Sequence, residues 1–132
     1  MRVLVTGSSG RVGRAVYVRL CHDHAVIGLD RSPSSTADVV GDCGDVDLAR
    51  GALKGVDAVV HTAALHAPHV GFVADSEFER VNVRATGALV EAAEAAGVRR
   101  FVYTSTTALY GAASKQASSA VWVDEELEPQ PT

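Results

Sequence analysis

The chain begins with MRVLVTGSSGRVGRAV, residues 1–16, and this stretch decides the fold. Its apolar run at residues 2–6 is too short for a helix and is typical of a buried strand. Three glycines follow at a spacing of three: Gly7, Gly10 and Gly13. The residues that come next place apolar side chains at helical spacing. The pattern therefore predicts a strand, a tight glycine turn and a helix.

A turn of this kind can present backbone N–H groups and the positive end of a helix to an anion. For a diphosphate, Gly7 would allow the tight turn, Gly10 the close approach, and Gly13 the packing of helix against strand. Ser8 and Ser9 would add hydroxyl donors. A glycine turn without a ligand is the alternative, because the spacing G-x-x-G-x-x-G is a weak signal by itself.

The rest of the chain alternates apolar β-branched runs with helical patterns. Helices are predicted at 11–21, 46–53 and 77–96, and strands at 2–6, 25–29, 37–40, 56–61 and 100–104. This alternation predicts an α/β fold: a Rossmann-like, doubly wound parallel sheet of about five strands, covered on both faces. We expect residues 1–110 to form this domain. Residues 111–132 are predicted as a loop, with a short strand at 120–123.

The composition is that of an ordinary globular protein, with 47% hydrophobic residues. The net charge of −4 argues against a general affinity for nucleic acid. No apolar run is long enough to span a membrane. Cys21 and Cys43 stand apart, which favours a reduced, cytoplasmic protein. No cysteine pairs or acids accompany the histidines at ligand spacing, so no metal site is predicted for His22, His24, His66 and His69.

The strand predicted at 25–29 is followed by Asp30, about 20 residues past the glycines. In a dinucleotide site, an acid at this distance accepts hydrogen bonds from the adenine ribose. A carboxylate also repels a 2′-phosphate, so NAD is favoured over NADP. Arg31 leaves NADP open, because its guanidinium could pair with that phosphate or stack on the adenine. An acid that merely ends a strand in solvent is the alternative for Asp30.

Five motifs together resemble the extended short-chain dehydrogenase/reductases, which are NAD-dependent epimerases and dehydratases that commonly act on nucleotide sugars. The motifs are Val5–Gly13, Asp30, Gly41-Asp42, His61-Thr62-Ala63-Ala64 and Phe101–Gly111. The resemblance covers almost all of the chain. It implies hydride transfer to NAD, with the cofactor pyrophosphate over Gly10, Arg11 and Val12.

The resemblance also implies roles for single polar residues. Asp42 would bind the adenine amino group, with the Cys43 backbone alongside; the alternative is that Asp42 caps the short helix together with Asp45. Asn82 would lie near the nicotinamide, although an asparagine in a helix often bonds nearby backbone instead. His66 lies where some family members contact the phosphates, and here a surface histidine is the preferred interpretation.

Further residues are implied at the ends of two strands. Thr62, Ala63 and Ala64 match the segment that lines the pyrophosphate and the nicotinamide ribose, where small side chains leave room for the cofactor. Thr104 matches a residue near the nicotinamide. Thr106 takes the place of the family's catalytic hydroxyl, which hydrogen-bonds the reacting oxygen of the substrate. The alternative is that these hydroxyls only complete hydrogen bonds at the end of the strand.

The family's catalytic tyrosine and lysine stand four residues apart, on one face of a helix. Tyr110 and Lys115 are five apart, and Tyr110 falls in the family's Tyr-Gly turn, so we do not take them for this pair. The acidic, proline-containing stretch 122–131 resembles the loop that precedes the catalytic tyrosine. We therefore expect the N-terminal, cofactor-binding portion of an enzyme, truncated at its C-terminus.

Two expectations about binding follow from this interpretation. A non-catalytic, NAD-sensing or regulatory module is the alternative to an enzyme portion. The outer face of the helix predicted at 77–96 would be uncovered, which predicts a homodimer or self-association through that helix. The other expected partner is a small-molecule substrate, for which a nucleotide sugar is one candidate.

Overall fold

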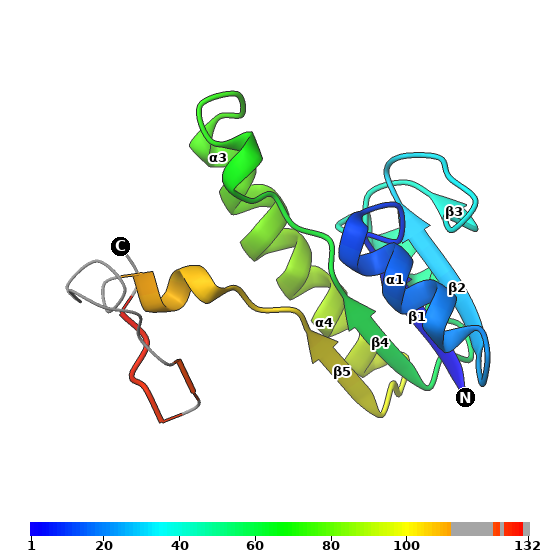
Figure 1. Cartoon of the computed structure of the whole chain (residues 1–132). Coiled ribbons are helices and arrows are strands. Elements are labelled where there is room, and N and C mark those ends of the chain that lie inside the picture. Colours follow the sequence, from blue (N-terminus) through cyan, green and yellow to red (C-terminus); the bar gives the residue numbers. More distant parts are fainter. Residues whose placement is uncertain (112–122, 125, 131–132) are drawn as a thin grey trace.

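The computed structural model describes residues 1–111, 123–124 and 126–130. Five parallel strands form one sheet of order β3-β2-β1-β4-β5 (Figure 1). The strands are β1 (Arg2–Thr6), β2 (Ala25–Asp30), β3 (Val39–Val40), β4 (Ala58–His61) and β5 (Arg100–Tyr103). The predicted Rossmann-like, doubly wound α/β fold is confirmed. The division into 1–110 and 111–132 stays a prediction.

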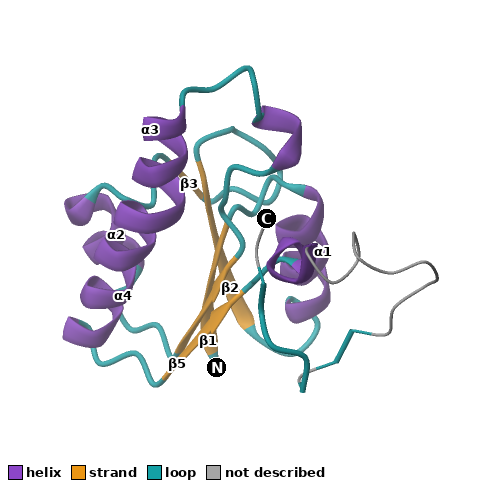
Figure 2. Cartoon of the chain, turned by 90° about the vertical axis from the view of Figure 1, so that its left-hand side faces the viewer, coloured by secondary structure: helices purple, strands orange, loops and turns teal. Residues whose placement is uncertain are grey.

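Helices cover both faces of the sheet. The helical elements are α1 (Arg11–Leu20), α2 (Val46–Ala52), α3 (Asp75–Phe78), the π-helical η2 (Glu79–Arg84) and α4 (Ala85–Ala95), with 3-10 turns η1 (Ala67–His69) and η3 (Thr107–Tyr110). Figure 2 shows α1 on one face and α2, α3 and α4 on the other. None of the helices that the structure describes is long and apolar enough to cross a membrane.

Successive residues of β1 pack on opposite faces, because side chains of a strand alternate in direction. Leu4 is fully buried in a cluster with Leu53 and Leu89, on the face covered by α2 and α4. Val3 and Val5 are buried on the other face, against the apolar side of α1. The continuous apolar run of β1 is thus explained by a strand that is covered on both sides.

The register brings the carboxyl ends of the strands to one edge of the sheet. Thr6 pairs with Leu29 of β2 and with His61 of β4, and His61 pairs with Tyr103 of β5. The chain leaves β1 toward β2 and leaves β4 toward β5, so the connections diverge between β1 and β4. Ligands of open parallel sheets bind outside the strand ends at such a point.

The long helix differs from its prediction at 77–96. It begins at Asp75, and its residues 79–84 form the π-helical segment η2. A single wide turn changes little in the spacing of apolar residues, so the sequence pattern does not reveal it. The end of the helix is as predicted, because Gly97 adopts a positive φ of 74°.

The strand predicted at 37–40 contains only the two residues of β3. The reason is local: the side chain of Asp38 accepts a hydrogen bond from the backbone N–H of Gly28 at 2.7 Å and takes the place of a ladder partner. The strand predicted at 120–123 lies outside the described residues except for Val123, which is not in a strand.

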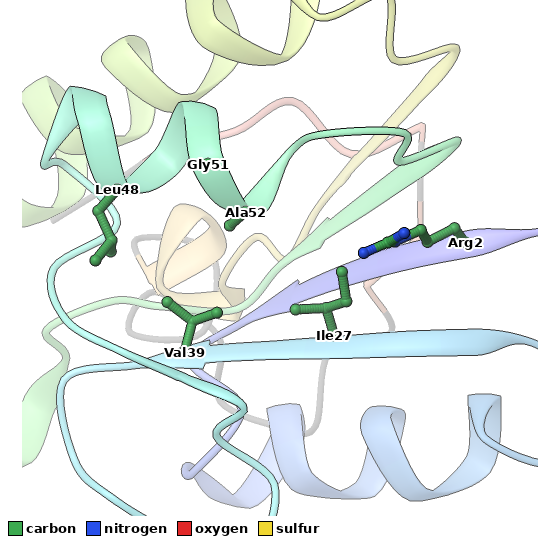
Figure 3. Close-up of a pocket in the computed structure, with 6 residues that line it drawn as sticks. All are labelled: Arg2, Ile27, Val39, Leu48, Gly51 and Ala52. Carbon is green, nitrogen blue, oxygen red and sulfur yellow. The ribbon is translucent and has the colours of Figure 1, made fainter.

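An open hollow of about 490 Å³ lies between α2 and the β2–β3 side of the sheet (Figure 3). Its lining is mostly apolar and consists of Arg2, Ile27, Val39, Leu48, Gly51 and Ala52. Arg2 is the first residue of β1, whereas the glycine turn follows the last. The hollow therefore runs beneath α2 from the amino end of β1 to Val39 of β3, and its lining contains none of the predicted site residues.

Candidate functional site

The glycine turn is packed tightly beneath the loop that follows β4. Gly7 has a φ of +69°, and a Cβ there would lie 2.7 Å from the backbone nitrogen of Ala63. A Cβ on Gly13 would collide with the carbonyl oxygen of Gly7 and lie 2.7 Å from Oγ1 of Thr62. The turn is tied to β2 by the N–H of Gly7, which donates to Leu29 at 2.9 Å. The predicted roles of these two glycines in turn and packing match the geometry.

The first turn of α1 is open to an anion. Its N-cap is Gly10, which supplies no side-chain hydrogen bond, and the turn contains no acidic residue. The first backbone bond runs from Arg14 to Gly10 at 2.9 Å, so the N–H groups of Arg11 and Val12 have no partner within the helix. A Cβ on Gly10 would meet only the Gly7 carbonyl, at 3.2 Å, which leaves the outer side free.

The start of α2 is built differently and corrects one prediction. Its N-cap is Asp45, whose carboxylate accepts from the N–H groups of Asp47 at 3.0 Å and Leu48 at 3.1 Å. The side chain of Asp42 takes no part in this cap, contrary to the alternative in which both aspartates would share it; only its carbonyl accepts from the N–H of Asp45, at 3.0 Å. The first-turn N–H groups of α2 are therefore bound by the Asp45 side chain, whereas the first turn of α1 has no side-chain cap.

Asp30 ends β2 beside the glycine turn. Its Oδ2 accepts from the N–H of Ser9 at 3.0 Å, and its Oδ1 accepts from the N–H of Ser32 at 2.8 Å. These two bonds hold the half-buried carboxylate in place. Since a carboxylate offers about four acceptor positions, Asp30 keeps capacity for two hydroxyl donors.

A chain of hydroxyl groups joins the glycine turn to the loop after β2. Ser9 Oγ donates to the Ser32 carbonyl at 2.7 Å and lies 2.9 Å from Ser34 Oγ. Ser34 Oγ is 3.0 Å from Thr36 Oγ1, which donates to the Ser8 carbonyl at 2.6 Å. Ser8 departs from its prediction as an anion donor, because its hydroxyl is buried and has no partner among the described residues. Its inward direction follows from the close packing of the turn on β2.

Asp42, in the loop after β3, is held by two donors. Its Oδ1 accepts from the N–H of Gly44 at 2.8 Å, and its Oδ2 accepts from Nη1 of Arg80 at 2.9 Å. Partial burial opposes ionisation, but these hydrogen bonds outweigh it and place the pKa of Asp42 below its ordinary value. Cys43 is buried in the core beside it, and that burial raises the pKa of its thiol to about 11.

His61 connects the glycine strand to α4. Its Nδ1 lies 2.6 Å from Thr6 Oγ1, and its Nε2 lies 2.9 Å from Thr86 Oγ1. The side chain is only 1% exposed, and this burial lowers its pKa to about 4. Thr62 continues the link, since its hydroxyl donates to the Thr6 carbonyl at 2.7 Å. Ala64, the last residue of the predicted segment, is exposed.

Asn82 fixes the loop that leaves β4. Its Oδ1 accepts from the N–H of Leu65 at 2.8 Å, and its Nδ2 donates to the Leu65 carbonyl at 2.9 Å. Asn82 lies within the π-helical segment, where single wide turns often mark functional sites. The backbone-bonding alternative for Asn82 is thus realised, and a contact with the nicotinamide stays a prediction.

The hydroxyl residues after β5 lie at the same edge of the sheet. The N–H of Thr104 donates to the His61 carbonyl at 3.0 Å, and the Thr104 side chain is exposed. Thr106 is exposed as well, and its Oγ1 accepts from the N–H of Ala108 at 3.2 Å, which caps η3. The Thr106 hydroxyl therefore keeps its proton for another acceptor. Lys115 lies outside the described residues.

These observations bring most of the predicted site residues together at one edge of the sheet. The described residues hold no group of three or more metal-ligating side chains. A model of the NAD dependent epimerase/dehydratase family matches residues 3–131. The chain belongs to this family. Its members are NAD-dependent, in agreement with the predicted cofactor.

Three relatives illustrate the range of this epimerase/dehydratase family. A 3 beta-hydroxysteroid dehydrogenase/Delta 5-->4-isomerase of Mycobacterium tuberculosis is 38% identical over 82% of this chain and 32% of its own. A short-chain dehydrogenase/reductase superfamily protein of Agrobacterium tumefaciens with bound NAD is 36% identical, with a TM-score of 0.83, over 100% of this chain and 40% of its own. MoeE5 in complex with UDP-glucose and NAD is 30% identical, with a TM-score of 0.83, over 99% of this chain and 43% of its own. The chain thus spans about a third to two fifths of these relatives.

Sequence reasoning missed several residues of the candidate site. Ser32 and Ser34 contact Asp30 and Ser9, and Arg80 contacts Asp42. A serine in a loop or an arginine on a helix gives no signal of its own, because its partner is distant in the sequence. The resemblance named Asp42 but not the guanidinium that holds it.

Proposed function

We propose that these residues bind the adenosine diphosphate part of NAD. The observation that carries the proposal is the Asp30 carboxylate, fixed by the N–H of Ser9 at 3.0 Å, beside a helix N-terminus without a side-chain cap. The pyrophosphate would accept from the N–H groups of Arg11 and Val12. The adenine ribose would donate its hydroxyls to the free acceptor positions of Asp30.

The same geometry supports NAD over NADP. The backbone N–H groups of Ser9 and Ser32 donate to Asp30, so neither is free to bind a 2′-phosphate. The negative charge of Asp30 would also repel that phosphate. Arg31 is the cation that could offset this repulsion, and it lies within 3.6 Å of Glu77.

We infer that the whole protein is an oxidoreductase, epimerase or dehydratase that acts by hydride transfer. Its substrate would carry a hydroxyl or carbonyl group, with a nucleotide sugar as the first candidate, because MoeE5 holds UDP-glucose. Bound NAD supplies the hydride acceptor. Thr106 would donate its free hydroxyl proton to the reacting oxygen of the substrate, with Thr104 beside the nicotinamide.

A binding role without catalysis is the second candidate for this chain. The 132 residues contain no tyrosine with a lysine four residues later. Hydride transfer in the family depends on proton removal by that tyrosine, so we propose that the chain by itself binds NAD without turnover. A cytoplasmic location is proposed on the two free thiols of Cys21 and Cys43.

We also propose self-association through the outer face of η2 and α4. Val83 is 63% exposed and Val90 is 41% exposed, with Gly87 between them on the same helical stripe. Sedimentation should show concentration-dependent association that Val83→Glu and Val90→Glu weaken. Val18→Glu, at an equally apolar and exposed position of α1, is the matched control. A monomer at every concentration tested would contradict the proposal.

NAD titration by calorimetry tests the binding proposal. Asp30→Asn should weaken NAD binding at least about tenfold, since a charge-assisted hydrogen bond contributes about 1.5–3 kcal/mol. Asp47→Asn removes the same charge from the exposed side of α2 and should leave the affinity unchanged. Equal binding by the parent and Asp30→Asn, or no binding by the parent, would contradict the proposal.

A further inference from the structure

Four charged side chains form a chain of alternating sign beside the proposed adenosine site. Nη1 of Arg31 lies 3.6 Å from Oε1 of Glu77. Glu77 accepts from Nε and Nη2 of Arg80, each at 2.7 Å. Nη1 of Arg80 donates to Asp42 at 2.9 Å. This row of two cations and two anions thus joins the loops after β2 and β3 to the helical segment α3–η2.

Within this row of charges, Arg31 is the residue that bears on the choice between NAD and NADP. It follows Asp30, the proposed ribose acceptor, directly in the sequence. An arginine near the 2′ position of the ribose is the group that accommodates a 2′-phosphate, because the guanidinium fork matches phosphate geometry. The partner that Arg31 has here is a carboxylate of α3.

We propose that Glu77 strengthens the preference for NAD over NADP by holding Arg31 away from a 2′-phosphate. This inference rests on the proposed NAD site and adds a residue that does not touch the cofactor. Glu77 thereby occupies the guanidinium of Arg31, which would otherwise favour NADP. The selectivity for NAD then has two sources, the repulsion by Asp30 and the capture of Arg31.

The geometry shows why Glu77 can hold a partner at a partly exposed site. Both of its carboxylate oxygens are fixed by Arg80, and Arg80 is fixed in turn by Asp42. The hydrogen bonds from Arg80 lower the pKa of Glu77, so the carboxylate is ionised at neutral pH. Arg31 therefore meets an ordered anion, and little side-chain entropy of Glu77 opposes the pairing.

The test is the ratio of the NADP and NAD dissociation constants, measured on the full chain by ligand-observed NMR competition. Glu77→Gln should raise NADP affinity about three- to fivefold, because breaking a half-exposed ion pair frees the guanidinium at a cost of up to about 1 kcal/mol. It should change NAD affinity less than about twofold. Asp30 stays in place, so NAD should remain the preferred cofactor.

Glu79→Gln is the matched control. Glu79 pairs with Arg84 at 2.8 Å, two residues further along the same helical run, and the substitution removes the same charge. It should leave the ratio unchanged. An equal rise of NADP affinity in Glu79→Gln would show a general electrostatic effect and overturn the proposal.

Arg31→Ala completes a double-mutant cycle, and its effect in the parent chain does not depend on the folding of Glu77→Gln. In the parent chain it should leave NADP affinity unchanged, because Arg31 is held by Glu77. In the Glu77→Gln background it should abolish the gain. A selective loss of NADP affinity in the parent, or a gain that survives without Arg31, would overturn the proposal. Failure of the parent to bind NAD would refute the proposed function itself.

Discussion

Gly13 shows how strictly single residues constrain the turn after β1. A Cβ at this position would collide with the carbonyl oxygen of Gly7. The contact is with backbone, which cannot move aside without moving the whole turn. Gly87, in the interior of α4, is the opposite case, because a Cβ there would meet nothing within 4 Å.

Gly13→Ala should therefore destabilise the protein by about 3 kcal/mol, in the range of overpacked sites. Gly87→Ala should stabilise it by about 0.5–1 kcal/mol, because alanine is the better helix former. Urea unfolding followed by circular dichroism measures both free energies. Equal effects of the two substitutions would show that the turn is not packed as described.

His61 predicts a pH dependence of stability. Burial lowers its pKa to about 4 in the folded chain, whereas the imidazole of an unfolded chain titrates near 6.5. Below pH 6.5 the unfolded state binds a proton that the folded state does not, so stability falls as the pH drops from about 6.5 to about 4. The loss over this window should reach about 3 kcal/mol.

The free energy of unfolding at several pH values between 7.5 and 4 checks this prediction. His61→Gln removes the titrating group and leaves a side chain that can still bond Thr6 and Thr86, so the slope in this window should flatten. An unchanged slope in His61→Gln would assign the pH dependence to other groups.

The sequence could predict that the glycines form a turn and that Asp30 follows the second strand, because a tight turn and a strand end leave such residues at fixed spacing. It could not predict that Arg80 holds Asp42 or that Glu77 holds Arg31. Each of these ion pairs joins segments that are far apart in the chain. A charged residue on an exposed helix turn has the same local pattern whether it is paired or solvated.

At the scale of elements, the π-helical segment η2 determines where the loop after β4 lies. It carries Asn82, whose amide bonds both the N–H and the carbonyl of Leu65. The helix itself was predictable from its apolar spacing. The wide turn was not, because a single wide turn changes little in the spacing of apolar residues.

Asn82→Ala should release this loop. The substitution leaves the N–H and the carbonyl of Leu65 without their hydrogen-bond partners, which should lower the free energy of unfolding by about 1–3 kcal/mol. Hydrogen exchange should become faster at the Leu65 amide while the amides of β4 stay protected. Arg84→Ala, in the same segment but with an exposed ion pair, should change neither quantity. Unchanged exchange at the Leu65 amide in Asn82→Ala would show that Asn82 does not fix this loop.

At the scale of the whole molecule, five parallel strands place every proposed cofactor contact at one edge of the sheet. Strand and helix alternation was enough to predict this arrangement, since parallel strands require crossover helices on the faces. The hollow of about 490 Å³ beside α2 was not predictable from the sequence, because it depends on how one helix sits over three strands.

The most direct test of the account is a titration of the isotope-labelled chain with NAD, followed through backbone amide resonances. We predict the largest shifts at Arg11 and Val12, where the pyrophosphate would accept hydrogen bonds, and next at Ser9 and Ser32 beside Asp30. Shifts centred instead on Gly51 and the rest of the hollow's lining, with the first turn of α1 unchanged, would contradict the proposed NAD site.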